Sequence, residues 1–147
     1  MAKKKDENED KIVEKKENKD FIHAHGRRKT ATARIRLYTK GGEFSVNGMS
    51  IEEYFPGQIA KTKYQSPLII TNTLGKMSAS FKVSGSGKNS QLGAVIHALS
   101  RALINVNPDF RAKLKPHNLL TRDPRAKERR KYGLAQKARK GKQSPKR

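Results

Sequence analysis

Lysine and arginine side chains dominate the chemistry that this sequence can perform. The chain of 147 residues holds 34 Lys and Arg residues against 13 Asp and Glu residues, a formal net charge of +21. Arginine binds a phosphate group through two parallel hydrogen bonds, and lysine attracts it as a compact point charge. The charge therefore predicts a polyanionic partner. We expect nucleic acid and not a membrane, because neither end of the chain has the pattern of a basic amphipathic helix.

Three basic clusters have a spacing that suits a phosphate backbone. They are Arg27, Arg28 and Lys29 in a short run, Arg34 and Arg36 on one face of an alternating segment, and Arg122, Arg125, Lys127, Arg129, Arg130 and Lys131 in the C-terminal segment. Aromatic side chains that could stack on unpaired bases are few, mainly Tyr38 and Tyr132. The pattern indicates recognition of the shape and backbone of structured RNA, not base-by-base reading.

A glycine-rich loop at residues 84–89 superficially suggests a nucleotide-binding P-loop, which requires Gly, four residues, then Gly-Lys and Ser or Thr. The pattern fails twice, because Lys82 stands in the place of the first glycine and Asn89 follows Lys88. Two interpretations stay open. The backbone amides and Lys88 hold a nucleic-acid phosphate, or the loop is an ordinary turn between a strand and a helix.

The remaining reactive side chains do not form a recognisable catalytic or metal site. The chain has no Cys, and the histidines at positions 23, 25, 97 and 117 lack a carboxylate or a second histidine cluster at ligand spacing. Of the four acids between residues 21 and 121, Glu53 and Asp109 are explained as helix-start residues. No carboxylate pair is left for acid–base catalysis. We therefore expect no enzyme activity, metal, cofactor or small-molecule substrate.

The charge distribution predicts three regions. Residues 1–20 hold 7 Lys and 7 acidic residues with few apolar ones, and we expect a disordered extension. Residues 21–121 hold nearly every aliphatic and aromatic residue and form the globular domain. Residues 122–147 hold 12 basic and 2 acidic residues, which predicts an extended tail that needs a polyanion to become ordered. No apolar run approaches the roughly 18 residues of a membrane span, so we expect a soluble, intracellular protein.

Apolar periodicity within residues 21–121 predicts an α+β fold, a small mixed sheet with helices packed on one face. Strict alternation predicts strands over 30–38 and 77–83, and the first is expected to form a hairpin with residues 44–46. A stripe at intervals of three and four predicts a long helix over 90–106.

Shorter helices are expected on either side of these elements. Ser50 and Glu53 fit a capping box at the start of one short helix, and Asn107 with Pro108 begins another. Residues 58–75 are ambiguous in pattern; we expect a short helix to Tyr64 and an extended stretch at 68–70 after Pro67.

Several ordered motifs carry a resemblance to a known family. They are Gly26-Arg27-Arg28-Lys29-Thr30-Ala31, Asn47-Gly48 with Glu53-Tyr54-Phe55-Pro56, Leu119-Leu120-Thr121-Arg122-Asp123-Pro124-Arg125, Glu128-Arg129-Arg130-Lys131-Tyr132-Gly133-Leu134 and the terminal Lys146-Arg147. Together they resemble the bacterial-type small-subunit ribosomal protein S-nine family, from about residue 23 to residue 147.

The resemblance implies a domain like the second domain of the fifth small-subunit protein, placed on the head of the subunit against the 3′ major domain of its rRNA, beside other head proteins in cytoplasmic ribosomes. It implies that the tail threads through rRNA and ends at the P-site tRNA. By position, Arg147 and Lys146 would contact tRNA phosphates, and Arg129, Arg130, Lys131, Arg139 and Lys140 would neutralise rRNA. The chain departs from the family in having Pro145 before the final pair and no Phe nearby.

Two other classes of function compete with this interpretation. A general nucleic-acid compaction protein could carry the same charge, and it would bind duplex DNA and rRNA fragments about equally at matched salt. A small phosphotransfer enzyme would need metal-binding carboxylates near Gly85 and Lys88, and the sequence places none there. Similarity of fold alone would not support such an enzyme.

Overall fold

The computed structural model describes residues 21–134 and 137–140. In these residues five strands form one mixed sheet with the order β1-β2-β5-β3-β4, in which only β3 and β5 pair in parallel. The strands are β1 (Ile22–Arg28), β2 (Ala31–Tyr38), β3 (Phe44–Val46), β4 (Met49–Ser50) and β5 (Ser78–Ser84). The helices are α2 (Ile51–Tyr54), α3 (Gln58–Ile70), α4 (Lys88–Val106) and α5 (Phe110–Leu114). The predicted α+β class is confirmed.

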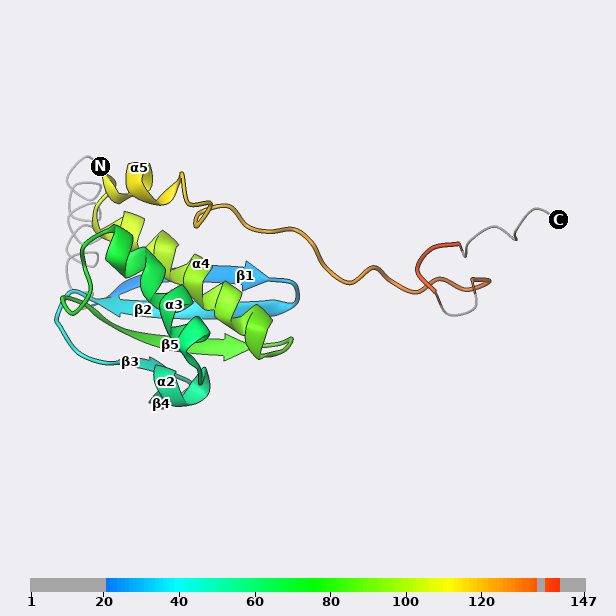
Figure 1. Cartoon of the computed structure of the whole chain (residues 1–147), viewed down its shortest axis with the longest axis horizontal. Coiled ribbons are helices and arrows are strands. Elements are labelled where there is room, and N and C mark those ends of the chain that lie inside the picture. Colours follow the sequence, from blue (N-terminus) through cyan, green and yellow to red (C-terminus); the bar gives the residue numbers. More distant parts are fainter. Residues whose placement is uncertain (1–20, 135–136, 141–147) are drawn as a thin grey trace, which may run out of the picture.

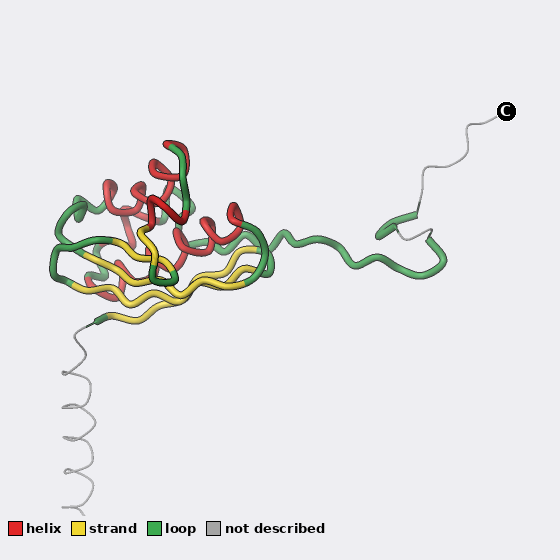
Figure 2. Tube along the Cα trace, turned by 90° about the horizontal axis from the view of Figure 1, so that it is seen from below, coloured by secondary structure: helices red, strands yellow, loops and turns green. Residues whose placement is uncertain are grey.

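The hydrophobic core lies between the sheet and the longer helices, which Figure 2 shows on one side of the strands. Alternation in β2 turns Ile35 and Leu37 inward, and β5 does the same with Phe81; all three are almost fully buried. The stripe on α4 buries Leu99 and Leu103 against them. Each such side chain contributes roughly 1.5 to 3 kcal/mol on burial. The predicted strands near 30–38 and 77–83 and the predicted long helix are confirmed.

The predicted hairpin between residues 30–38 and 44–46 is wrong. Strand β5 lies between β2 and β3, pairing with β2 along its whole length, from Thr32 to Tyr38. The seven-residue β5 offers more antiparallel pairs than the three-residue β3, so the local turn at 40–42 does not decide the pairing. Asn47 holds β3 in place, since its side-chain amide bonds both the N–H and the carbonyl of Val83 at 2.9 and 3.0 Å.

Strand β1 is an element that the sequence patterns did not reveal. It pairs with β2 from Ile22 to Arg28, through a tight turn in which Lys29 has a φ of 53°. Its buried positions carry only Ala24 and Gly26, so the apolar alternation is weak. Their small size lets α4 approach this strand closely.

Two further expectations about helices are wrong. Ser50 precedes α2, but its side chain makes no capping hydrogen bond, so the capping box does not form. The stretch at 68–70 is not extended, because α3 continues through Pro67 to Ile70. Burial of Pro67 and Leu68 favours the helix over the usual helix-breaking effect of proline, and the hydroxyl of Thr71 donates to the Pro67 carbonyl at 2.8 Å.

The segment after α5 contains neither helix nor strand over residues 115–134 and 137–140. Figure 1 shows its described part leaving the sheet and the helices after passing beside β1. Contacts between the globular part and the start of this segment therefore set the direction in which the basic C-terminal residues leave.

Candidate nucleic-acid interface

The side of the sheet opposite α4 carries a row of cations. Arg34 in β2 lies directly across from His25 in β1 and from Lys82 in β5, and all three are exposed. Side chains paired in this way have Cβ atoms about 4.5 to 5.5 Å apart. We define the outer sheet face as His23, His25 and Arg27 of β1, Thr32, Arg34 and Arg36 of β2, and Ser80, Lys82 and Ser84 of β5. None of these nine residues is a carboxylate, and Arg27, Arg34, Arg36 and Lys82 give the face a net positive charge.

Two open hollows lie on the outer sheet face. One of about 630 Å³ lies beside the β3–β4 turn, and one of about 520 Å³ lies beside Phe21. Arg34 and Lys82 line both hollows. The guanidinium of Arg36 is held 5.1 Å from the centre of the Phe21 ring, and the hydroxyls of Thr32 and Ser84 lie 3.1 Å apart. Cations and hydroxyl donors placed side by side suit phosphate oxygens.

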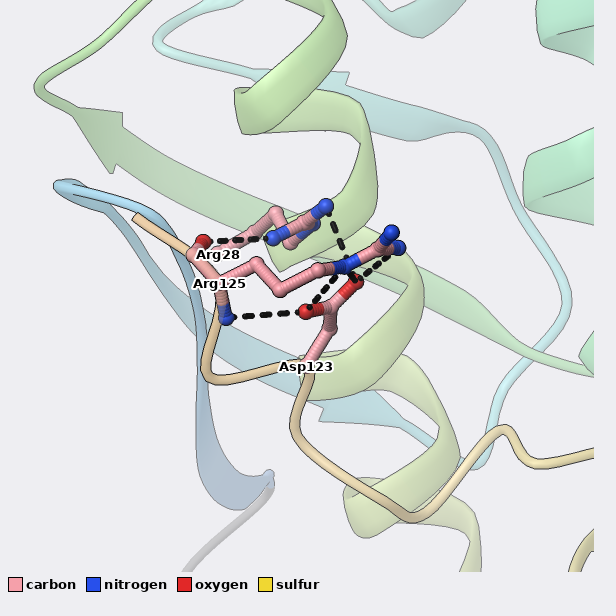
Figure 3. Close-up of polar contacts among 3 residues, drawn as sticks. All are labelled: Arg28, Asp123 and Arg125. Carbon is pink, nitrogen blue, oxygen red and sulfur yellow. Dashed lines mark hydrogen bonds and ion pairs between the residues drawn. The ribbon is translucent and has the colours of Figure 1, made fainter. Parts of the chain in front are cut away.

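Arg28 and Arg125, both predicted RNA contacts, meet around Asp123 (Figure 3). Arg28 pairs with the Asp123 carboxylate at 2.9 Å and donates to the Arg125 carbonyl, also at 2.9 Å. Arg125 donates to the same carboxylate from Nη2 at 2.7 Å and from its backbone N–H at 2.9 Å. These bonds from Arg125 hold the pKa of Asp123 well below its usual range. The three residues clamp the start of the C-terminal segment to the end of β1.

His97 makes a second link between the globular part and this segment. The backbone N–H of Arg27 donates to Nδ1 of His97 at 3.3 Å, so the neutral ring carries its proton on Nε2. Nε2 then donates to the Leu120 carbonyl at 3.2 Å. The side chain is half-buried in α4, and its contacts explain it as a structural residue.

His97 and His25 predict a pH dependence of stability. Burial lowers the pKa of His97 below its ordinary value of 6.5, and the charge of Arg101 lowers the pKa of His25. The unfolded chain therefore takes up protons first as the pH falls, which stabilises the unfolded state. We expect the free energy of unfolding to be highest above about pH 6.5 and to decrease below it. Urea unfolding at pH 7.5 and 5.5, followed by circular dichroism, measures the difference.

The variant His97→Gln should reduce this loss of stability between the two pH values, and His117→Gln should leave it unchanged. His117 is an exposed residue that makes no side-chain hydrogen bond among the described contacts. Equal losses in the wild type and in His97→Gln would contradict the assignment.

Lys88, the predicted contact in the glycine-rich loop, lies over a tyrosine. Its ammonium is 3.4 Å from the centre of the Tyr54 ring and donates to the Tyr54 carbonyl at 3.2 Å. Gly85 has a φ of 80°, and a Cβ there would lie 2.5 Å from the Thr30 carbonyl. Close packing against the β1–β2 turn therefore explains this glycine, which favours the interpretation as a turn between a strand and a helix.

The predicted contacts in the C-terminal segment fall into two groups. Glu128 pairs with Arg139 at 2.8 Å and with Lys131 at 3.6 Å, so these two cations share one carboxylate. Apart from Arg125 in the clamp, the other predicted contacts in the described part of this segment are solvent-exposed; they are Arg122, Arg129, Arg130 and Lys140. Lys146 and Arg147 lie outside the described residues.

Lys82 and Asp123 matter to the interface and were not among the predicted contacts. Lys82 was visible as an outward position of an alternating strand, but its neighbours became known only with the strand order. Asp123 stood in a motif beside predicted contacts, and its carboxylate is what turns Arg28 inward. The sequence signal that could have indicated this pairing was a single acidic residue among many basic ones.

Comparison with known proteins decides the family of the chain. The sequence profile of the family described as ribosomal protein S9/S16 matches residues 26–147. The chain belongs to the ribosomal protein S9/S16 family. It is 49% identical over 115 residues to the small ribosomal subunit protein uS9 of Lawsonia intracellularis, covering 78% of this chain and 88% of the relative. It is also 49% identical over 116 residues to that of Maridesulfovibrio salexigens, covering 79% and 89%.

Membership of the S9/S16 family confirms the resemblance seen in the sequence motifs. Members of this family are structural constituents of the small ribosomal subunit and not enzymes, as predicted for this chain. The expected location in the cytoplasmic ribosome follows from this membership. Among residues 21–134 and 137–140, none of the helices has the length and apolarity needed to cross a membrane.

Proposed function

We propose that this ribosomal protein binds rRNA of the subunit head through its outer sheet face, and that its C-terminal residues contact P-site tRNA. The observation that carries the rRNA part is the row of Arg34 and Lys82 on a face without a carboxylate. Such a surface attracts the phosphate backbone strongly and is read by shape, which suits a folded rRNA. The rRNA in question is the 3′ major domain, with neighbouring head proteins beside it.

The predicted rRNA contacts divide into binding and positioning residues. Exposed cations in the described part of the chain bind phosphates directly; they are Arg27, Lys29, Arg34, Arg36, Arg122, Arg129, Arg130 and Lys140. Arg28 is held by Asp123 and positions the C-terminal segment, while Arg125, whose side chain is 83% exposed, does both. Lys88, Lys131 and Arg139 have protein partners and contribute charge to the same field.

The C-terminal region 122–147 acts as a separate unit in this proposal. A polycation of this kind gains order when phosphates neutralise it, and release of counterions supplies the affinity. The clamp around Asp123 fixes where the unit leaves the globular part. The family match extends to residue 147, so the final Lys146 and Arg147 fall within the matched region.

Deleting Lys146 and Arg147 tests the tRNA contact. We expect the truncated chain to assemble into small subunits normally, because the outer sheet face and the clamp are intact. Purified mutant subunits should release P-site tRNA faster and maintain the reading frame less well, since two charges that face tRNA phosphates are lost. Filter binding of tRNA to the subunits measures the rate of tRNA release.

A matched control removes two positive charges elsewhere. Lys63→Gln with Lys76→Gln changes exposed residues of α3 and of the loop before β5, far along the chain from the C-terminus. This control should bind tRNA as the wild type does. Unchanged tRNA affinity in the truncated subunits would refute the tRNA contact while leaving rRNA binding in place.

A further inference from the structure

A second cationic hollow lies between α4, α5 and the start of the C-terminal segment. It has a volume of about 440 Å³ and is separate from the outer sheet face. We define the α4–α5 pocket by the residues that line it, His97, Arg101, Ile104, Asn105, Arg111, Lys115, Leu120 and Thr121. None of these residues was among the contacts expected from the sequence.

Three cations converge on the α4–α5 pocket without a carboxylate among the lining residues. Arg111 lies in α5 and Lys115 caps its end, four residues later, so they lie on the same side of the helix. Arg101 is fixed from α4, because its Nη1 donates to the His25 carbonyl at 2.9 Å. Like charges held together in this way repel one another, and an anion between them removes the repulsion.

The charge of Arg101 lowers the pKa of two histidines, His97 in the pocket and His25 on the neighbouring strand β1. The charge of Arg101 is the largest cause that lowers the pKa of His25. Burial is the largest cause for His97, and the charges of Arg101 and Arg122 add to it. The part of each shift that Arg101 causes is consistent with the positive charge of the pocket.

We propose that the α4–α5 pocket binds one phosphate group of an RNA backbone, as a contact additional to the outer sheet face. Arg101 and Arg111 offer forked donors, Lys115 offers a point charge, and Asn105 and Thr121 add neutral donors at the rim. This proposal rests on the rRNA binding proposed above. It places RNA on both sides of the sheet and helix layers, so the rRNA wraps around the edge that β1 forms.

The double variant Arg111→Gln/Lys115→Gln tests the pocket in the full-length chain. The probe is a transcript of the 3′ major domain of small-subunit rRNA, bound at several KCl concentrations. Loss of one phosphate contact should lower the slope of log affinity against log salt by about 1, and weaken binding about eightfold at 0.1 M salt. The control is Lys63→Gln/Lys76→Gln, which removes the same charge from other exposed positions.

The outcomes separate the pocket from the proposed function. A lower slope in the pocket variant and a wild-type slope in the control support the pocket, provided that circular dichroism shows equal melting. Equal slopes in the wild type and the pocket variant overturn the pocket and leave rRNA binding intact. Equal weakening by the control overturns it too, because net charge then explains the effect. If wild-type protein binds duplex DNA as tightly as the transcript, the proposed function and the pocket both fail.

Discussion

The variant Gly26→Ala should lose about 3 kcal/mol of stability, the largest effect of a single methyl group that we expect in this fold. A Cβ at position 26 would lie 2.2 Å from the carbonyl oxygen of Ala94 and 2.4 Å from the backbone nitrogen of Ala98. Both atoms belong to the backbone of α4, so they cannot move without the helix. The helix and β1 must separate, which opens the core where the two elements are most closely packed. Urea unfolding followed by circular dichroism measures the loss.

Gly87→Ala is the matched control for this prediction. It makes the same chemical change at the residue before α4, where an added Cβ meets no atom within 4 Å. We expect a change of no more than about 1 kcal/mol, the usual difference between Gly and Ala at a helix N-cap. If both variants lose the same stability, the contact between β1 and α4 is not the cause.

The sequence predicted those elements whose pattern is set by local burial. Alternation in β2 and β5 and the stripe on α4 arise because each element buries one face in the same core. Strand β1 was not predicted because its buried positions hold Ala24 and Gly26. These residues are small so that α4 can pack closely against the strand, and they give no clear apolar alternation. The pairing of β2 with β5 was not predicted either. The two strands are far apart in sequence, and the turn at 40–42 suggested pairing with the nearer residues 44–46.

The candidate interface shows the same division. The outward direction of Arg34 and Arg36 followed from alternation, and the structure exposes both. Their joining with Lys82 into one surface depends on the strand order. Arg28 looked equivalent to its neighbours in sequence, and its engagement with Asp123 depends on a contact across 95 positions of the chain. Residue type thus predicted the kind of partner, while tertiary contacts decide which cations are free to bind it.

The double variant Arg34→Gln/Lys82→Gln should weaken binding to the 3′ major domain transcript about 60-fold at 0.1 M salt. These residues lie opposite each other on adjacent strands and line both hollows of the outer sheet face. Removing them should eliminate two phosphate contacts and lower the salt slope by about 2. Stability should change by less than about 0.5 kcal/mol, because both side chains point to solvent. Binding measured over a range of KCl concentrations gives both quantities.

Combining this variant with Arg111→Gln/Lys115→Gln tests whether RNA binds the outer sheet face and the α4–α5 pocket independently. If separate phosphates occupy the outer sheet face and the α4–α5 pocket, the losses in log affinity should add, because distant sites that share no partners act independently. A wild-type slope for Arg34→Gln/Lys82→Gln would instead show that the sheet face does not meet RNA. A combined loss no larger than that of the sheet variant would mean that the pocket is filled only when RNA already lies on the sheet. RNA binding to the outer sheet face would then be a condition for RNA binding to the α4–α5 pocket.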